Sequence, residues 1–183
     1  ALMERLWPAL QDIDSSTGAL GRAVFTTLDK LIPMLIDAPA DRKTRQAWLE
    51  RLFTAIQSDG VDYLAPVEDR WGDICVFPEL ADAWVEDLMP VVRRVWSDHN
   101  HFSVVKGDHA CLSCLLQLGR YQDLHELLSV RARPNWLDDQ YGAEALARQG
   151  LTDAAISFSV ARRGVGYDKW QIIGFCERVL LDA

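Results

Sequence analysis

The sequence predicts an all-α protein, and three observations lead to this prediction. Apolar residues recur at helical spacing along almost the whole chain, so that they line one face of each segment. The alternation of apolar and polar residues that marks a half-buried strand is nearly absent. The 183 residues are 49% apolar and 25% charged, which is an ordinary globular composition. A chain of this length buries a sizeable core as one domain or two small ones.

Two long helices are expected before Gly60. The first runs from about Gly18 to Asp37, and Pro33 is expected to kink it. Its inner face consists of Leu20, Val24, Leu28, Leu31 and Leu35. The second follows the N-cap residue Asp41 and ends at Gly60, which can take the left-handed conformation of a helix end. Its inner face consists of Trp48, Leu52, Ala55 and Ile56.

A third long helix is expected to open at Pro78, because the first turn of a helix does not need the N–H that proline lacks. Pro90 is expected to break this helix in two. Its inner side carries Leu80, Trp84, Leu88, Val91, Val92 and Val95. The stretch Asp73–Phe77 just before it is the strand-like part of the sequence, to be read as a short strand or as extended coil.

Five shorter helices are predicted in the second half of the chain, where helical periodicity continues between turns rich in glycine and proline. They cover residues 109–118, 121–131, 137–149, 152–163 and 168–181. Because these helices are short, each must bury its apolar face against a neighbour. We therefore expect Leu115 and Leu124 to be buried between paired helices.

The C-terminal half contains two stretches of similar sequence. Residues 115–124 (LLQLGRYQDL) are similar to residues 146–155 (LARQGLTDAA), and each stretch reads as the end of a helix, a turn led by glycine and a second helix. The spacing between the two glycines, Gly119 and Gly150, matches the period of a repeat built from two helices. Helix pairs of this kind stack on one another and share a continuous core.

In this region the chain resembles the tetratricopeptide (TPR) repeat proteins. Residues 119–128 (GRYQDLHELL) follow the family pattern Gly-x-Tyr-x-x-Ala-x-x-x-Phe, with leucine at both packing positions. The second copy matches less well, because Ser159 stands where an aromatic residue is expected. The stretch Cys111–Tyr121 and the Phe-Cys-Glu at residues 175–177 are also similar to uncharacterised bacterial helical-repeat proteins.

The resemblance implies an αα-superhelix of TPR-like hairpins over residues 101–183, preceded by an N-terminal helical region over residues 1–100. The two parts are expected to pack as one continuous domain. The last predicted helix, residues 168–181, is unusually apolar for the end of such a stack. Either it packs against a partner, as in a homo-oligomer, or further repeats belong to a longer chain, to which the start at Ala1 also points.

Reactive side chains are densest in one short stretch that contains every candidate metal ligand. These candidates are His99, His101, His109, Cys111 and Cys114. Imidazole and thiolate groups are ligands that Zn²⁺ prefers. However, Cys111 and Cys114 continue the apolar stripe of a helix, and free cysteine often behaves as a small buried hydrophobe. We therefore expect no metal and no other cofactor, with a zinc-binding regulatory protein as the alternative.

The whole net charge of −8 falls in about one sixth of the chain. Residues 59–87 contain nine acids and one base, so the remainder of the chain is neutral. Such a segment is either a solvated surface or an acidic docking surface for a basic protein partner, with apolar residues as anchors. On the second interpretation the partner-binding residues are Glu68, Asp69, Trp71, Asp73 and Phe77.

Several other classes of function are disfavoured. A pI near 4.9 argues against nucleic-acid binding, which needs concentrated positive charge. No apolar run approaches the length of a membrane span, and the first residues do not form a signal peptide. Four cysteines in a chain of this size do not form a disulfide framework, which favours reduced thiols in the cytoplasm.

The leading interpretation is a non-catalytic protein–protein interaction or scaffold module, because helical repeats offer an extended surface and no chemistry of their own. The sequence contains no Gly-x-Ser-x-Gly elbow and no glycine-rich phosphate loop, so we do not expect an enzyme. Two alternatives stay open. One is the zinc-binding regulatory protein, and the other is an enzyme with its active site in a cleft between the two helical regions.

Overall fold

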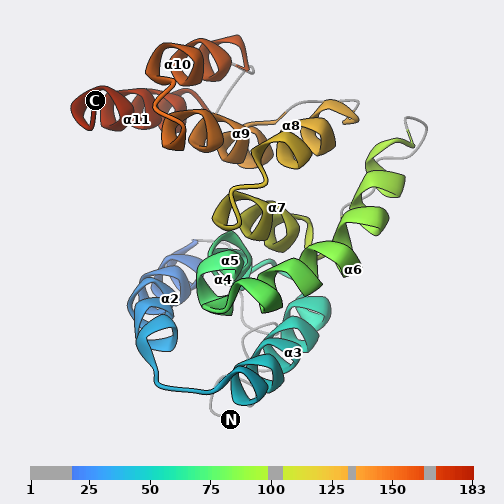
Figure 1. The fold of residues 1–183 in the computed structure, drawn as a ribbon. Helices are drawn as coiled ribbons and strands as arrows, with labels where there is room; N and C mark the ends of the chain where they lie inside the picture. Colours follow the sequence, from blue (N-terminus) through green and yellow to red (C-terminus); the bar gives the residue numbers. More distant parts are fainter. Residues whose placement is uncertain (1–17, 99–104, 132–134, 163–167) are drawn as a thin grey trace.

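The computed structural model describes residues 18–98, 105–131, 135–162 and 168–183, and every regular element in these ranges is a helix (Figure 1). The N-terminal part contains α2 (Ala19–Asp37), α3 (Arg42–Ser58), α4 (Ala65–Asp69), α5 (Trp71–Cys75) and α6 (Pro78–Trp96). The C-terminal part contains α7 (Asp108–Gln117), α8 (Tyr121–Ser129), α9 (Trp136–Arg148), α10 (Thr152–Ala161) and α11 (Asp168–Leu181). For these residues the prediction of an all-α protein is confirmed.

The long helices begin where the sequence predicts, but prolines do not interrupt them. Asp41 caps α3, since its Oδ1 atom accepts a hydrogen bond from the backbone N–H of Thr44 at 2.8 Å. α2 runs unbroken past Pro33, and α6 runs unbroken past Pro90. Both prolines are exposed, so water can satisfy the carbonyl groups that lose their helical partners. The prediction that Pro90 divides its helix is therefore wrong.

The segment before α6 is helical, which corrects the prediction of a strand or extended coil at Asp73–Phe77. Most of that stretch belongs to α5, whose residues Trp71, Ile74 and Cys75 are fully buried at helical spacing. A run of five residues is too short for the helical and strand periods to be told apart. Packing of α5 against α7, α6 and α3 decides the conformation.

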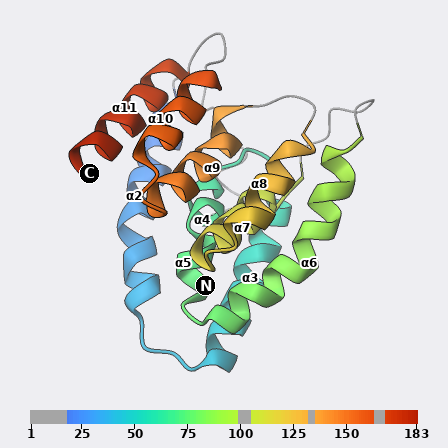
Figure 2. The ribbon, with the colours of Figure 1, turned by 45° about the horizontal axis from the view of Figure 1, so that its top comes forward.

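The central helix of the fold is α7 (Figures 1 and 2). It contacts α4, α5 and α6 of the N-terminal part and α8 and α9 of the C-terminal part. All its residues from Ala110 to Leu116 are buried, so the helix is covered on every side. Leu115 in α7 and Leu124 in α8 have no exposed surface, which confirms the prediction for both.

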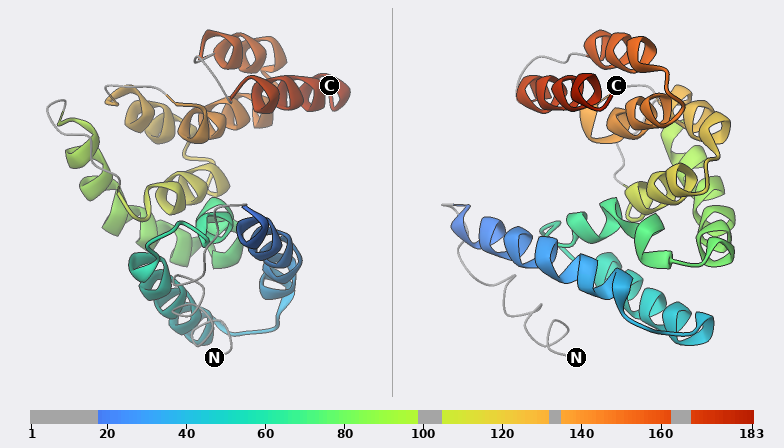
Figure 3. Two further views of the ribbon diagram at one scale, coloured as in Figure 1. Left: turned by 180° about the vertical axis from the view of Figure 1, so that it is seen from behind. Right: turned by 60° about the vertical axis from the view of Figure 1, so that its left-hand side comes forward.

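One hydrophobic core extends from α2 to α9 and continues across the expected division near residue 100. A smaller cluster of Trp136, Ala143 and Ile172 joins α9 to α11. Figure 3 shows the result in two views: α9, α10 and α11 form a layer at the opposite end of the molecule from α2 and α3, and α7 lies between them. Side chains that link α7 to both sides therefore hold the two ends together.

The helix pairs α7–α8 and α9–α10 are joined by turns of the same geometry. Gly119 and Gly150 both have a left-handed backbone, with φ angles of 69° and 73°. In each turn the residue after the glycine donates its N–H to the carbonyl group five residues earlier, at 2.9 Å after Gly119 and 3.1 Å after Gly150. This is the Schellman end of a helix, which glycine adopts without a Cβ clash. The similarity between the two stretches of sequence thus corresponds to two turns of the same geometry.

α5 and α7 approach each other so closely that Gly72 has no room for a side chain. A Cβ atom at Gly72 would lie 2.4 Å from the carbonyl oxygen of Ser113. Gly72→Ala is therefore expected to force the two helices apart and to lower the free energy of unfolding by about 1–3 kcal/mol. Gly60→Ala is the matched control, because a Cβ atom at Gly60 meets nothing within 4 Å. Urea melts measure both variants, and an unchanged midpoint for Gly72→Ala contradicts the close approach.

Candidate functional site

A buried polar cluster lies where α4, α7 and α9 meet, and His109 of α7 is at its centre. The Nδ1 atom of His109 is 2.7 Å from Oδ1 of Asp69, the last residue of α4. Its Nε2 atom is 3.0 Å from Oδ1 of Asp138 in the first turn of α9. Tyr141 of α9 donates its hydroxyl to the same oxygen of Asp69 at 3.0 Å. The imidazole therefore joins the N-terminal and C-terminal parts, with both of its nitrogens occupied.

Local structure fixes both acids that bind His109. The hydroxyl of Ser113 donates to the carbonyl oxygen of Asp69 at 3.0 Å and accepts from the N–H of Gly72 at 3.0 Å, which anchors the α4–α5 junction on α7. Asn135 caps α9 and donates its amide to Oδ2 of Asp138 at 2.9 Å. These contacts fix the backbone of Asp69 and the carboxylate of Asp138.

Acidic groups outnumber basic groups in the polar cluster. Arg131 pairs with Asp138 and lies 4.8 Å above the ring of Trp96, and Arg162 is 3.8 Å from Asp139. The cluster contains the five carboxylates Glu68, Asp69, Asp108, Asp138 and Asp139 and the three cationic groups His109, Arg131 and Arg162. With His109 protonated, the cluster has two more carboxylates than cations; Lys106, whose charge also acts on Glu68, pairs with Asp62 outside the cluster.

This charge balance shifts the pKa values of the buried groups. Burial alone would lower the pKa of His109, but the hydrogen bond with Asp69 and the charge of Asp108 outweigh burial and raise it. Burial raises the pKa of Asp108. The pKa of Glu68 rises to about 7, first because of burial and then because of the charge of Asp108. Glu68 accepts the backbone N–H of Gly107 at 3.0 Å, which offsets part of this shift.

The raised pKa of Glu68 predicts that the protein loses stability as the pH rises. Its folded pKa of about 7 exceeds the ordinary 4.5, so the folded protein keeps a proton that the unfolded chain releases. This stabilisation is complete below about pH 4.5 and disappears as the pH passes about 7. His109, whose pKa is also raised, acts in the same direction. Glu68→Gln should remove up to about 3 kcal/mol of pH dependence from urea melts between about pH 5 and pH 8, and an equally steep profile in the variant contradicts this assignment.

The reactive side chains of the polar cluster are hydrogen-bonded within the chain. A general base needs an atom that can reach the substrate, but both nitrogens of His109 are bonded to carboxylates. The hydroxyl of Tyr141 is bonded to Asp69, and burial raises its pKa well above the ordinary value. The hydroxyl of Ser113 is bonded to the backbone on both sides.

The cysteines at the centre of the fold are part of the core, as the sequence predicts for Cys111 and Cys114. Both, together with Cys75 of α5, have no exposed surface. Cys114 hydrogen-bonds with Cys75, and burial raises the pKa of Cys111 to about 12. At neutral pH Cys111 and Cys114 are therefore protonated thiols, whereas a zinc ligand is a thiolate.

The candidate zinc ligands that the structure describes do not form a metal site. His109 is bonded to two carboxylates in the polar cluster, while His99 and His101 lie outside the described residues. Within the described ranges no group of three His, Cys, Asp or Glu residues is placed to hold a metal ion. We expect elemental analysis of the purified protein to find no stoichiometric zinc. One zinc ion per chain that is lost in Cys114→Ser would reverse this prediction.

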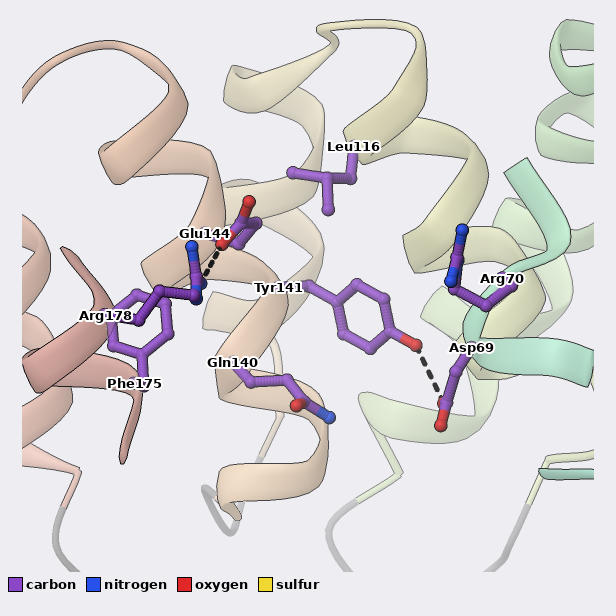
Figure 4. Close-up of a pocket in the computed structure, with 8 residues that line it drawn as sticks. All are labelled: Asp69, Arg70, Leu116, Gln140, Tyr141, Glu144, Phe175 and Arg178. Carbon is purple, nitrogen blue, oxygen red and sulfur yellow. Dashed lines mark hydrogen bonds and ion pairs between the residues drawn. The ribbon is translucent and has the colours of Figure 1, made fainter. Parts of the chain in front are cut away.

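A pocket of about 250 Å³ opens beside the polar cluster (Figure 4). Its walls come from the end of α4 and from α7, α9 and α11. Its lining residues are Asp69, Arg70, Leu116, Gln140, Tyr141, Glu144, Phe175 and Arg178. Figure 4 shows the hydroxyl of Tyr141 directed at Asp69 on one side of the pocket and Arg178 beside Phe175 and Glu144 on the other.

Both arginines of the pocket have acidic partners within the chain. Arg178 is 2.6 Å from Glu144 and lies 5.1 Å above the ring of Phe175. Arg70 is 2.5 Å from Asp73. The side chain of Asp69 is 42% exposed although one of its oxygens accepts two hydrogen bonds. Asp69 therefore belongs both to the buried cluster and to the wall of the pocket.

The prediction of an acidic docking surface fails most clearly at Trp71. Its side chain has no exposed surface and packs edge-on against Phe53 and Trp84, with ring centroids 5.8 Å and 5.2 Å away. Trp71 faces inward because α5 is a helix whose inner face packs on α3 and α6. It is an anchor of the core, and the expectation that it anchors a partner is wrong.

The other residues expected in the docking surface do not share one exposed face. Glu68 is buried beside Gly107, and Phe77 is partly buried against the core. The side chains of Asp69 and Asp73 are 42% and 29% exposed. Of the five expected partner-binding residues, Asp69 and Asp73 have the accessible carboxylates, and Asp62, Asp82 and Glu86 of the same acidic segment are exposed as well.

The sequence offers little indication of the residues that complete the site. Asp138 and Tyr141 are the main omissions, since they come from a different helix and lie 29 and 32 positions after His109. One local signal exists: Asp138 lies on the same helical face as the buried Tyr141, where an acid needs an internal partner. The identity of that partner depends on the fold.

None of the helices in the described ranges is long and apolar enough to cross a membrane. Comparison with known protein families, curated proteins and solved structures finds no significant match to this chain.

Proposed function

We propose that this protein is a non-catalytic interaction module of helical-repeat type that binds a segment of a protein partner on the face formed by α7, α9 and α11. This α7–α9–α11 face contains the pocket next to the polar cluster. Cytoplasmic location belongs to the same proposal and is supported by four free cysteines, three of them buried. The proposal also contains the TPR-like superhelix expected from the sequence.

The order of helix contacts supports the repeat interpretation. α7, α9 and α11 contact one another in sequence, while α8 contacts α7 and α9 and α10 contacts α9 and α11. In a helical-repeat stack, the first helices of successive pairs line one side and the second helices line the other. The equal turns at Gly119 and Gly150 repeat this arrangement from one pair to the next.

The observation that carries the proposal is the composition of the pocket. Protein interfaces are enriched in aromatic residues and arginine, and their anchors fill partly enclosed pockets. Here Tyr141 and Phe175 provide rings, Leu116 provides an apolar wall, and Gln140 provides an amide. The residues come from three first helices, as expected for a segment that crosses the stack.

The arrangement of polar groups supports a non-catalytic role. The pocket contains carboxylates and arginines, but the arginines are paired with Glu144 and Asp73, and the carboxylate of Asp69 is held by His109 and Tyr141. Groups paired in this way are suited to oriented recognition. This pairing favours binding over an enzymatic role in the same cleft, which requires a free base or nucleophile.

A selection experiment tests the proposal. Short peptides are selected from a random display library on the folded protein, and their affinities are measured by fluorescence polarisation. Gln140→Trp fills the pocket and is expected to weaken the selected peptides at least tenfold. Asp153→Trp is the matched control, because Asp153 is exposed on α10, which contributes no residue to the pocket. Equal loss in both variants, or loss in neither, rejects the pocket as the binding site.

The apolar outer face of α11 supports the additional proposal of a contact between two copies of the chain. Trp170, Ile173, Leu180 and Leu181 are 76%, 40%, 61% and 79% exposed. Exposed apolar residues gathered on one helix often mark an association surface. Sedimentation at low and high protein concentration tests this contact, and a concentration-independent monomer excludes it.

A further inference from the structure

We infer that the pocket receives a cationic side chain, an arginine or a lysine of the partner segment, and that Asp69 is its counter-ion. The inference rests on the proposed function and specifies the chemistry of the partner. Three features of the described residues carry it: the fixed carboxylate of Asp69, a guanidinium already bound in the same pocket, and the surplus of acids behind it.

The carboxylate of Asp69 is oriented before any ligand arrives. Its Oδ1 atom accepts hydrogen bonds from Nδ1 of His109 at 2.7 Å and from the hydroxyl of Tyr141 at 3.0 Å. A carboxylate has about four acceptor positions, so two donors on one oxygen leave acceptor capacity for a ligand. The side chain is 42% exposed at the pocket wall, and its rotation is restricted by the two donors. Such preorganisation lowers the entropic cost of binding.

The pocket already shows how it accommodates a guanidinium group. Arg178 is 2.6 Å from the carboxylate of Glu144 and lies 5.1 Å above the ring of Phe175. This combination of an acid and an aromatic face is favourable for arginine. Asp69 and Tyr141 repeat the combination at the opposite side of the pocket (Figure 4). A second cation placed there would meet the same two kinds of group.

Charge in the surroundings favours a cation over an anion. The polar cluster contains Asp69 and four further carboxylates against three cationic groups, and residues 59–87 carry the whole net charge of the chain. The two arginines in the lining are neutralised by Asp73 and Glu144. A cationic ligand therefore reduces the local surplus of negative charge, while a carboxylate ligand increases it.

The test uses two small probes that differ in charge but hardly in shape. N-acetyl-arginine methylamide and N-acetyl-citrulline methylamide are titrated into the full chain, and NMR follows the methyl groups of Leu116 and the rings of Tyr141 and Phe175. We expect saturable shifts with the arginine probe and at least tenfold weaker binding of the citrulline probe. Asp69→Asn should also weaken the arginine probe at least tenfold, because the amide oxygen can keep both internal hydrogen bonds but carries no charge.

Asp82→Asn is the matched control, because Asp82 is an exposed acid 2.9 Å from Arg120 and lies outside the pocket. It should leave the affinity for the arginine probe unchanged. Equal affinity for both probes in the wild-type chain overturns the inference, even if Asp69→Asn fails to fold. Arginine shifts that survive Asp69→Asn, or that appear away from the pocket, also overturn it.

The failure of this inference can be told apart from failure of the proposed function. Selected peptides without arginine or lysine that lose affinity in Gln140→Trp leave the proposed function intact and reject the cationic ligand. Peptides that bind equally well to Gln140→Trp reject the proposed function, whatever their charge. Replacing each arginine of a selected peptide by citrulline separates the two results in one assay.

Discussion

His109→Leu is expected to lower the free energy of unfolding by about 1–3 kcal/mol, because two carboxylates each lose a hydrogen-bond partner, although Arg131 still pairs with Asp138. Asp138 has only 2% of its surface exposed and loses its contact with Nε2 of His109 in this variant. Asp69 loses its contact with Nδ1 at the same time. The link between α4, α7 and α9 is removed, so urea melts should show a large loss of stability.

A double-mutant cycle measures the direct interaction between His109 and Asp138. Asp138→Asn alone removes the carboxylate partner of Arg131, so the energy of the His109–Asp138 contact is the difference between the double variant His109→Leu with Asp138→Asn and the sum of the two single variants. Asp138→Asn keeps the cap of α9, because the side chain of Asn135 still accepts from the backbone N–H at position 138. A loss below about 1 kcal/mol for His109→Leu, or strictly additive losses in the double variant, would show that His109 does not link the two parts.

Leu115→Ala is expected to cost about 2–5 kcal/mol, the range for removing a leucine side chain from a packed core. Leu115 has no exposed surface and lies in α7, which contacts helices of both parts. A cavity at this position cannot be filled by solvent, and neighbours on every side restrict relaxation. Denaturant melts measure the loss.

The matched control for this substitution is Leu137→Ala in α9. Leu137 is 49% exposed, so its removal should change the free energy of unfolding by less than about 0.5 kcal/mol. A result for Leu115→Ala within error of the control contradicts the pairing of α7 with its neighbours. A similar loss in both variants shows that α9 is packed differently.

Helical periodicity predicts the long elements well, but it does not determine which residues face the core. Val24 and Leu28 of α2 are buried as predicted, whereas Leu31 is 40% exposed and Ile32 is buried in its place. The rotation of a helix about its axis depends on its neighbours, and an apolar stripe wider than the contact leaves this choice open. Periodicity does not predict the short helices α4 and α5 for a related reason, since five residues contain little more than one turn.

Arg45 shows what a local pattern cannot predict. Its side chain is 1% exposed, and its guanidinium donates to the carbonyl oxygens of Leu35 at 2.5 Å and Ala38 at 2.7 Å. These carbonyls lie at the end of α2, where a helix leaves acceptors without partners. A charged residue in the sequence suggests a solvated face. Its use as a cap follows from the turn that folds α3 back toward α2.

The polar cluster depends on contacts between distant residues. His109 lies 40 positions after Asp69 and 29 positions before Asp138, and no spacing within one helix relates them. The sequence includes Asp69 among the partner-binding candidates, but as part of a surface whose five residues do not share one exposed face in the structure. The pocket exists only where α4, α7, α9 and α11 come together, so no single segment of the sequence indicates it.

The central claim is that the α7–α9–α11 face binds a partner segment. A crystal structure of the chain with one selected peptide tests this claim most directly. We expect the peptide to cross the pocket between Tyr141 and Phe175 and to place an arginine or lysine side chain against Asp69. A peptide bound on α8 and α10, or on the outer face of α11, would contradict the claim.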